Sequence, residues 1–167
     1  MRRDVTVLGI LALVVAGLAA ACRPAPEEVA ADREEIRATL EAYADRLSQA
    51  YAFTDASILE GIASQREIAS VAGNIEILAR DGQRLATDLE ELQIEKIEMA
   101  DRGNAYVQTF EVWEIRVMDL GSERMISADR DQRNRVRYQL EKEEGRWRVL
   151  WRQRIDDAAP GGGGGGA

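Results

Sequence analysis

The sequence predicts an α+β domain in which N-terminal helices pack on a curved antiparallel sheet. One change of pattern along the chain supports this fold class. Apolar residues recur at steps of three and four as far as about residue 80, and they alternate with polar residues beyond about residue 92. Helices followed by consecutive strands are the layout of a domain whose helices cover one face of one antiparallel sheet. We expect this single domain to span residues 33–156.

The first helix is predicted from a stripe of apolar residues at helical spacing. The stripe consists of Ile36, Leu40, Tyr43, Leu47 and Tyr51. A short second helix can begin at Thr54 or Asp55, because either side chain can accept a hydrogen bond from a free backbone N–H group. It carries Ile58, Leu59 and Ile62.

A third helix begins at a capping box and ends at a glycine. The Ser64 hydroxyl and the Glu67 carboxylate can each satisfy a free N–H group of the first turn. Asp81 and Gly82 mark its end. Its apolar residues are Ile68, Val71, Ile75 and Leu78. We expect Leu85 and Leu89 to add one or two further helical turns.

Four strands are predicted from alternation and from β-branched and aromatic residues. They cover residues 92–99, 105–118, 133–142 and 146–155, with turns at 101–104, 119–122 and 143–145. On the last two strands we expect inward side chains at Val136, Tyr138, Leu140, Trp147, Val149, Trp151 and Ile155. The outward side chains are then Arg133, Arg135, Arg137, Arg146, Arg148, Arg152 and Arg154.

The first 21 residues have the order of a secretory signal peptide. Arg2 and Arg3 precede an uncharged run of seventeen residues from Val5 to Ala21, which ends in small residues directly before Cys22. This leader resembles those of bacterial lipoproteins. The resemblance implies that Cys22 becomes the mature N-terminus and carries acyl chains such as palmitate. More than one such chain gives stable membrane anchoring.

Two alternatives to a lipoprotein leader are open. An uncleaved signal anchor is disfavoured because the uncharged run is shorter than the roughly 20 residues of a spanning helix. A twin-arginine signal is disfavoured because Asp4 follows the arginines directly. The leader therefore predicts a lipid-anchored protein of the cell envelope that faces the periplasm or the exterior. Arg23, in place of an aspartate after the cysteine, favours the outer membrane of a Gram-negative host.

The segments that flank the domain are predicted to lack a packed core. Residues 22–32 contain Pro24, Pro26 and several alanines and form a tether. Residues 157–167, with six consecutive glycines, form a disordered tail because they cannot bury enough apolar area to offset the entropy of ordering.

Residue types that the chain lacks exclude several kinds of site. Cys22 is the only cysteine and the sequence has no histidine. A disulfide within the chain, a cysteine–histidine nucleophile, an ordinary zinc site and a histidine general base are therefore all impossible. We predict no metal, no cofactor and no catalytic residue.

The charge balance excludes a further class of partner. Without residues 1–21 the chain has 20 basic and 29 acidic residues, a net charge of −9. Nucleic-acid binding depends on Lys and Arg contacts to phosphates, so this balance argues against it. It also argues against electrostatic attachment to anionic lipid.

Two segments of the predicted sheet resemble a known superfamily. Residues 105–114 (AYVQTFEVWE) and 138–149 (YQLEKEEGRWRV) are similar to strands of the nuclear transport factor 2-like superfamily. The second segment ends in Gly-Arg-Trp-Arg-Val, at residues 145–149, which is typical of that superfamily. The domain that plastid-division proteins place between two membranes is similar as well. The resemblance covers about residues 33–156, and it implies a cone in which a curved sheet wraps a long helix. It does not imply one function, because this fold hosts many.

The resemblance implies a pocket inside the cone, which we expect Tyr43, Leu47 and Tyr51 to line. Catalytic members of the superfamily commonly use a histidine–aspartate pair or an acid in the cone. Here only acids such as Asp45, Asp55 and Glu60 could do acid–base work, and only if burial raised the pKa of one of them. Their spacing does not require such a role.

The outward arginines suggest an interaction face. Arg135, Arg137, Arg148 and Arg152 could bind phosphate or carboxylate groups. The alternative, which we favour, is that acids of neighbouring strands pair with the arginines and give a solvated or dimer-forming face. The candidate acids are Glu111, Glu114, Glu141 and Glu143. Trp113, Trp147 and Trp151 are expected to pack in the core or an interface.

Three hypotheses for function follow, in this order. The first is a non-catalytic, lipid-anchored domain that binds an unknown envelope protein, or a second copy of itself, through the sheet or the cone mouth. The second is a carrier or sensor of a small apolar ligand, which requires a cavity of several hundred cubic ångströms. The third is an enzyme that uses a carboxylate buried in the cone.

Overall fold

The computed structural model describes residues 26–155. The chain divides into two units, Met1–Asp32 and Arg33–Ala167, and the packing described below is that of the second. The predicted signal peptide, the lipidation of Cys22 and the predicted tail at 157–167 lie outside the described residues. Within the described range, no helix has both the length and the apolar character needed to cross a membrane.

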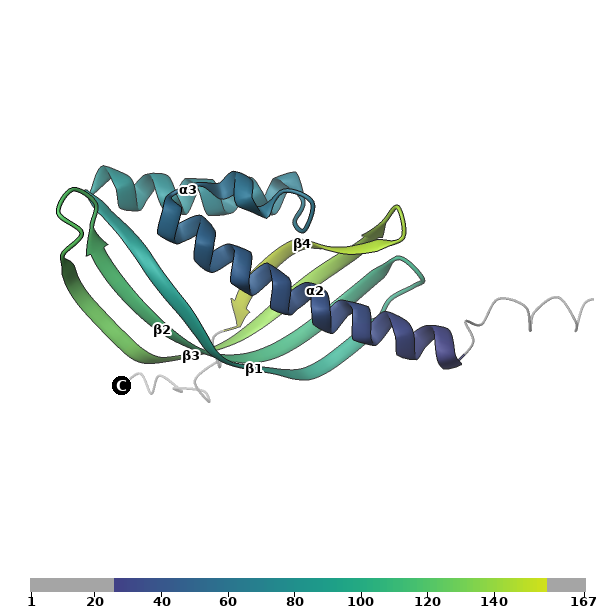
Figure 1. Ribbon diagram of the computed structural model, residues 1–167. Helices are drawn as coiled ribbons and strands as arrows, with labels where there is room; N and C mark the ends of the chain where they lie inside the picture. The colour runs from purple at the N-terminus through teal and green to yellow at the C-terminus, as the bar shows by residue number, and fades with distance from the viewer. Residues whose placement is uncertain (1–25, 156–167) are drawn as a thin grey trace, which may run out of the picture. The chain divides into compact units, whose positions relative to one another are not determined.

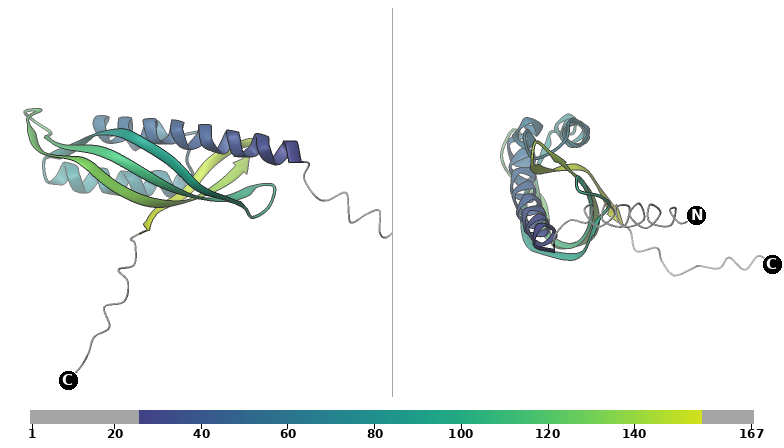
Figure 2. Two further views of the ribbon diagram at one scale, coloured as in Figure 1. Left: turned by 90° about the horizontal axis from the view of Figure 1, so that it is seen from below. Right: turned by 90° about the vertical axis from the view of Figure 1, so that its right-hand side faces the viewer.

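The predicted fold class is confirmed: two helices pack on a curved four-stranded antiparallel sheet (Figure 1). The sheet is a meander of order β1-β2-β3-β4, and it curves around one side of the helices when viewed end-on (Figure 2). In chain order the elements are α2 (Pro26–Phe53), the 3₁₀ turn η2 (Ala56–Leu59), α3 (Gln65–Arg80), β1 (Gln83–Met99), β2 (Asn104–Asp119), β3 (Met125–Glu143) and β4 (Arg146–Ile155).

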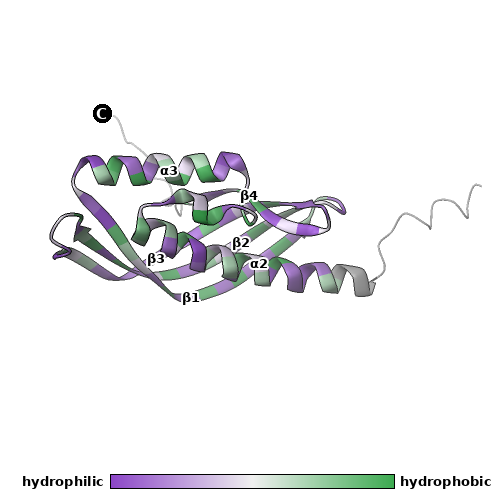
Figure 3. Ribbon diagram, turned by 45° about the horizontal axis from the view of Figure 1, so that its top comes forward, coloured by the Kyte–Doolittle hydropathy of each residue, from purple (hydrophilic) through white to green (hydrophobic). Residues whose placement is uncertain are grey.

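Helix α2 provides the centre of the core. It starts at Pro26, before the predicted helix, and proline is well tolerated in the first helical turn. All five residues of the predicted stripe are buried, from Ile36 to Tyr51. Hydrophilic and hydrophobic residues alternate along much of the sheet (Figure 3), and buried residues of β2, β3 and β4 join the α2 stripe in one core cluster. The sequence therefore predicted the main packing surface of the domain.

The connection to α3 follows the predicted capping signals. The Asp55 side chain accepts a hydrogen bond from the Ser57 backbone N–H at 2.9 Å and caps η2. Ser64 caps α3, which ends at Asp81 before Gly82, as predicted. Val71 and Ile75 are buried, so α3 also turns its apolar side inward.

Strand β1 corrects one prediction. Leu85 and Leu89 do not extend α3, because the chain enters the sheet at Gln83 and pairs with the second half of β2. The register shifts between Leu89 and Glu91 and again between Ile94 and Lys96. These two β-bulges keep residues that are three apart on the same side of the strand, so the apolar residues stay on the inner face.

Strand β3 is longer than predicted, because it already begins at Met125. Residues 125–132 lack an apolar alternation, and they enter the sheet by pairing with the second half of β2. Strand β4 pairs only with residues 135–143 of β3. Among the described strands, residues 125–134 of β3 therefore have β2 as their one neighbour.

A β-bulge in β4 overturns the predicted orientation of its second half. Trp147 and Val149 point inward as expected, but the register skips Leu150, and Gln139 of β3 faces Trp151. Beyond this extra residue the alternation is inverted. Trp151 and Ile155 therefore lie on the outer face, and Trp151 donates a hydrogen bond from Nε1 to the Gln139 side chain at 2.6 Å. Arg152 and Arg154, predicted to point outward, line the interior.

Candidate functional site

A cavity of about 330 Å³ lies between the two helices and the inner face of the sheet. Its wall has an apolar and a polar part. The apolar part consists of Leu47, Tyr51, Val71, Leu85, Trp113, Ile115 and Val136. The polar part consists of Glu67, Ser70, Asn74, Thr87, Glu111, Gln132, Asn134, Arg152 and Arg154.

Glu67 enters this wall from the first turn of α3. The Ser64 hydroxyl accepts a hydrogen bond from the Glu67 backbone N–H at 3.3 Å, as a helix cap does. The reciprocal half of the predicted capping box is absent, because the Ser64 backbone N–H donates to the Val149 carbonyl at 2.9 Å. The Glu67 carboxylate is therefore left for the interior, where only 3% of the residue is exposed.

Arg152 meets the same carboxylate from β4. Its Nε lies 3.3 Å from Oε1 of Glu67, and its backbone N–H donates to Oε2 at 3.3 Å. The contact depends on the bulge at Leu150, which turns Arg152 inward. It also depends on the backbone hydrogen bonds of Val149 to Ile62 and Ser64, which join β4 to the start of α3.

Glu111 is a second buried carboxylate, 1% exposed, on the inner face of β2. Its Oε1 accepts hydrogen bonds from the Thr109 and Tyr138 hydroxyls, each at 2.7 Å. Its Oε2 accepts one from Nε1 of Trp113 at 2.9 Å. The prediction that Glu111 pairs with an outward arginine is wrong, because the two-residue period of the strand places it on the same face as Trp113.

Two tyrosines stand beside these carboxylates. The Tyr43 hydroxyl donates to Oε1 of Glu67 at 2.6 Å, and the Tyr43 and Tyr138 rings meet edge to face with centroids 6.0 Å apart. Burial, reinforced by the neighbouring carboxylates, raises the pKa of both tyrosine hydroxyls well above its ordinary value. Both therefore stay protonated and serve as hydrogen-bond donors at neutral pH.

The arrangement holds its polar groups in fixed positions. Every oxygen of the two carboxylates already accepts a hydrogen bond, and such a satisfied network rigidifies a polar interior. Within residues 26–155, no group of three or more acidic, histidine or cysteine side chains is placed to hold a metal ion. The site is therefore a preformed cavity with a polar wall.

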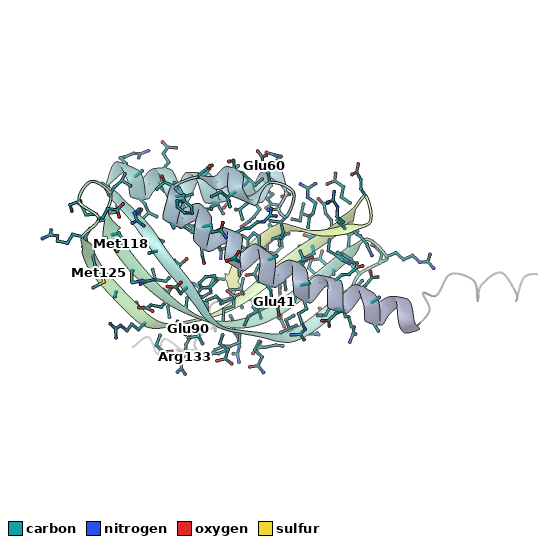
Figure 4. The ribbon with its side chains drawn as sticks, in the orientation of Figure 1. Glu41, Glu60, Glu90, Met118, Met125 and Arg133 are labelled. Carbon is teal, nitrogen blue, oxygen red and sulfur yellow. The ribbon has the colours of Figure 1, made fainter. Side chains whose placement is uncertain are left out.

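Two of the three predicted pocket residues line this cavity, and the predicted acids do not. Leu47 and Tyr51 line it, whereas Tyr43 lies behind it with its hydroxyl on Glu67. Asp45, Asp55 and Glu60 are exposed, and Glu60 lies on the outside near the start of α3 (Figure 4). The acids in the lining of the cavity are instead Glu67 and Glu111, for which the sequence predicts a helix cap and a place on the outer face.

The four arginines of the predicted interaction face do not form one surface. Arg137 is exposed, and Nε of Arg135 donates to Glu95 at 3.2 Å. Arg148 forms an ion pair with Glu143 and donates to the Ala63 carbonyl at 2.8 Å. Arg152 lines the cavity. Acids near the strands thus pair with two of these arginines, and the bulge removes a third from the outer face.

Comparison with known proteins assigns the chain to a family. A family model described as "ARC6-like, IMS domain" matches residues 47–150, which include the end of α2, all of α3 and most of the sheet. The chain belongs to this family. No curated protein matches the sequence.

Solved structures share the fold of this ARC6-like IMS domain. The intermembrane space region of the chloroplast protein ARC6 aligns with a TM-score of 0.62 at 15% identity, over 72% of this chain and 93% of that one. A nuclear transport factor 2-like protein from Salmonella enterica serovar Typhimurium LT2 aligns with a TM-score of 0.53 at 13% identity, over 82% of this chain and 99% of that one. A periplasmic fragment of TraM aligns with a TM-score of 0.52 at 11% identity, over 73% of this chain and 96% of that one. The expected fold is confirmed, and at these identities the likeness concerns the fold alone.

The first prediction concerns the buried ion pair of this ARC6-like IMS domain. Glu67→Gln is expected to lower the free energy of unfolding by about 2–3 kcal/mol, because it leaves the Arg152 guanidinium without its counter-charge. Urea unfolding followed by tryptophan fluorescence measures the change. The matched control is Glu60→Gln, the same substitution at an exposed acid, which should change stability by less than about 0.5 kcal/mol. Equal effects would contradict the role of the pair.

The second prediction concerns alkaline pH. The folded-state pKa of Tyr43 and of Tyr138 is raised, so the folded state keeps protons that the unfolded chain loses above about pH 10. The stability due to these groups is complete below that pH and falls as pH rises, by up to about 1.4 kcal/mol per pH unit for each tyrosine. Urea unfolding at successive pH values measures this slope. Tyr43→Phe and Tyr138→Phe should each make it shallower, and an unchanged slope would refute the assignment.

Proposed function

We propose that this chain is a non-catalytic binding domain of the cell envelope, anchored to a membrane through lipid on Cys22, and that it binds a small molecule inside its cone. The observation that carries the proposal is the cavity of about 330 Å³ with its divided wall. Small-molecule sites are concave, of about 300–1,000 Å³, and combine apolar walls with a few placed polar groups. The cavity has this size and this composition.

The state of the polar groups favours binding over catalysis. A general base needs a lone pair that can reach a substrate proton. Each oxygen of Glu67 and Glu111 already accepts a hydrogen bond from a protein donor, which holds both carboxylates in place. The tyrosines that contact them are held in the protonated form by the raised pKa of each hydroxyl. These groups support a wall of fixed shape and polarity.

The cavity is also a better candidate than the outer face of the sheet. A face that recognises an anionic partner needs several uncompensated arginines together. Arg135 and Arg148 are paired with Glu95 and Glu143, and Arg152 points to the other side of the sheet. A homodimer through the sheet stays a separate prediction of the sequence.

Two observations support an envelope location. The leader has the order of a lipoprotein signal and places a cysteine directly after small residues. Two proteins of similar fold are described as an intermembrane space region and a periplasmic fragment. The fold is therefore used in compartments next to membranes, as we propose for this chain.

The third prediction tests binding in the cavity. N-phenyl-1-naphthylamine, a neutral dye that fluoresces in apolar surroundings, should bind the purified full chain saturably. Ser70→Trp should abolish this binding, because Ser70 lines the cavity and the larger side chain fills it. Ala69→Trp is the control, since Ala69 is exposed on the same helix and does not line the cavity. Equal binding to both variants would refute the proposed site.

The fourth prediction tests the anchor. Cells that express the chain and are fed an alkyne fatty acid should label it, and Cys22→Ser should abolish the label. The same substitution should release the protein from membranes on washing, because covalent acyl chains are the proposed attachment. An unlabelled parent protein, or a Cys22→Ser variant that stays on the membrane, would contradict lipid anchoring.

A further inference from the structure

We propose that the ligand of this cavity is an amphipathic anion, with an oxyanion such as a carboxylate bound by Arg152 and an apolar body packed against the aliphatic side chains of the lining. This inference rests on the proposed function and adds the chemical class of the ligand. It is carried by the geometry of the Arg152 guanidinium and by the hydrogen-bonding state of the groups around it.

The guanidinium of arginine can bind oxygens along two edges, one of which includes Nε and the other the two terminal Nη atoms. Glu67 lies on the Nε side, with Nε to Oε1 at 3.3 Å. No hydrogen bond from either Nη atom to a residue of the described range is present. The side chain lines the cavity and keeps 26% of its surface exposed. The terminal edge of Arg152 is thus available to a bidentate oxyanion.

The two carboxylates in the wall do not prevent anion binding. Glu67 is neutralised by Arg152 itself. Glu111 accepts three hydrogen bonds from buried donors, which spread its charge and occupy both oxygens. Arg154 adds a second positive charge to the wall. The formal charges of these four residues therefore balance, and Arg152 keeps a donor edge open.

Neighbouring polar groups can donate as well. Gln132 and Asn134 lie on the inner face of β3, opposite Trp113 and Glu111 of β2. Neither side chain forms a hydrogen bond within residues 26–155. Their amide N–H groups can supplement Arg152. A ligand that supplies only acceptors, as an oxyanion does, matches this part of the wall.

The rest of the wall selects the body of the ligand. Leu47, Val71, Leu85 and Ile115 come from both helices and from two strands, and they face the interior as aliphatic side chains. A ligand of this class is therefore an acid with a compact apolar body, small enough for about 330 Å³.

The test compares two dyes that differ by one group. 8-Anilinonaphthalene-1-sulfonate is N-phenyl-1-naphthylamine with an added sulfonate, which presents oxygens to arginine as a carboxylate does. Binding is taken as the difference between the parent full chain and Ser70→Trp, so that dye bound outside the cavity cancels. We expect the sulfonate dye to bind about tenfold more tightly, the order of effect of a charge-assisted bidentate contact.

The matched variants are Arg152→Lys and Arg137→Lys. Arg152→Lys keeps the positive charge beside Glu67 but loses the bidentate guanidinium. It should therefore weaken binding of the sulfonate dye about tenfold and change the affinity for the neutral dye less than about twofold. Arg137 is exposed on the outer face of β3, and Arg137→Lys should change the affinity for neither dye. A variant-free measurement covers the case in which Arg152→Lys does not fold: octanoate, but not octanol, should displace the neutral dye from the parent.

The outcomes separate the two proposals. Preference for the sulfonate dye that Arg152→Lys removes, or displacement by octanoate alone, supports anion recognition. Equal cavity binding of both dyes, with octanoate no better than octanol, overturns anion recognition and leaves a cavity for neutral ligands. If neither dye shows binding to the parent chain that Ser70→Trp abolishes, both proposals are overturned.

Discussion

The ion pair between Glu67 and Arg152 is the interaction on which the interior of this domain depends. A charge removed from water is costly unless a partner compensates it, so neither residue is tolerated inside without the other. Glu67 comes from the first turn of α3 and Arg152 from the far end of the chain. Their contact therefore fixes the position of the helix on the last strand, and with it one wall of the cavity.

The second carboxylate extends this arrangement across the sheet. Glu111 is held by donors from β2 and β3, among them the Tyr138 hydroxyl, and Tyr138 packs edge to face on Tyr43 of α2. Tyr43 in turn donates to Glu67. Both helices and three strands thus contribute to one polar network, enclosed by apolar packing. A binding site built on such a network needs little rearrangement to accept a ligand, which lowers the entropy cost of binding.

The sequence predicted those parts of the fold that depend on local signals. The stripe of α2, the cap at Ser64 and the alternation of β2 each have one local interpretation, and all were found. Of the two candidates for the first cap, Thr54 and Asp55, the structure uses Asp55. The steps of three residues from Leu89 to Leu92 and from Ile94 to Ile97 could have indicated the bulges of β1. The bulge of β4 carried no such signal, because Val149, Leu150 and Trp151 are all apolar and fit either phase. The polar part of the cavity lining was missed for that reason, and because the partners of Glu67 are distant in sequence.

The unequal lengths of β3 and β4 have a consequence for how copies of the protein meet. Among the described strands, residues 125–134 leave one edge of β3 without a neighbour. The unpaired backbone groups of an exposed edge can form hydrogen bonds with a strand of another chain. This stretch carries Asp129, Arg130, Asp131 and Arg133, together with a bulge opposite Glu114. Charges and bulges on an open rim discourage fibril growth and runaway polymerisation. The domain is thus protected against aggregation where its hydrogen-bonding ladder ends.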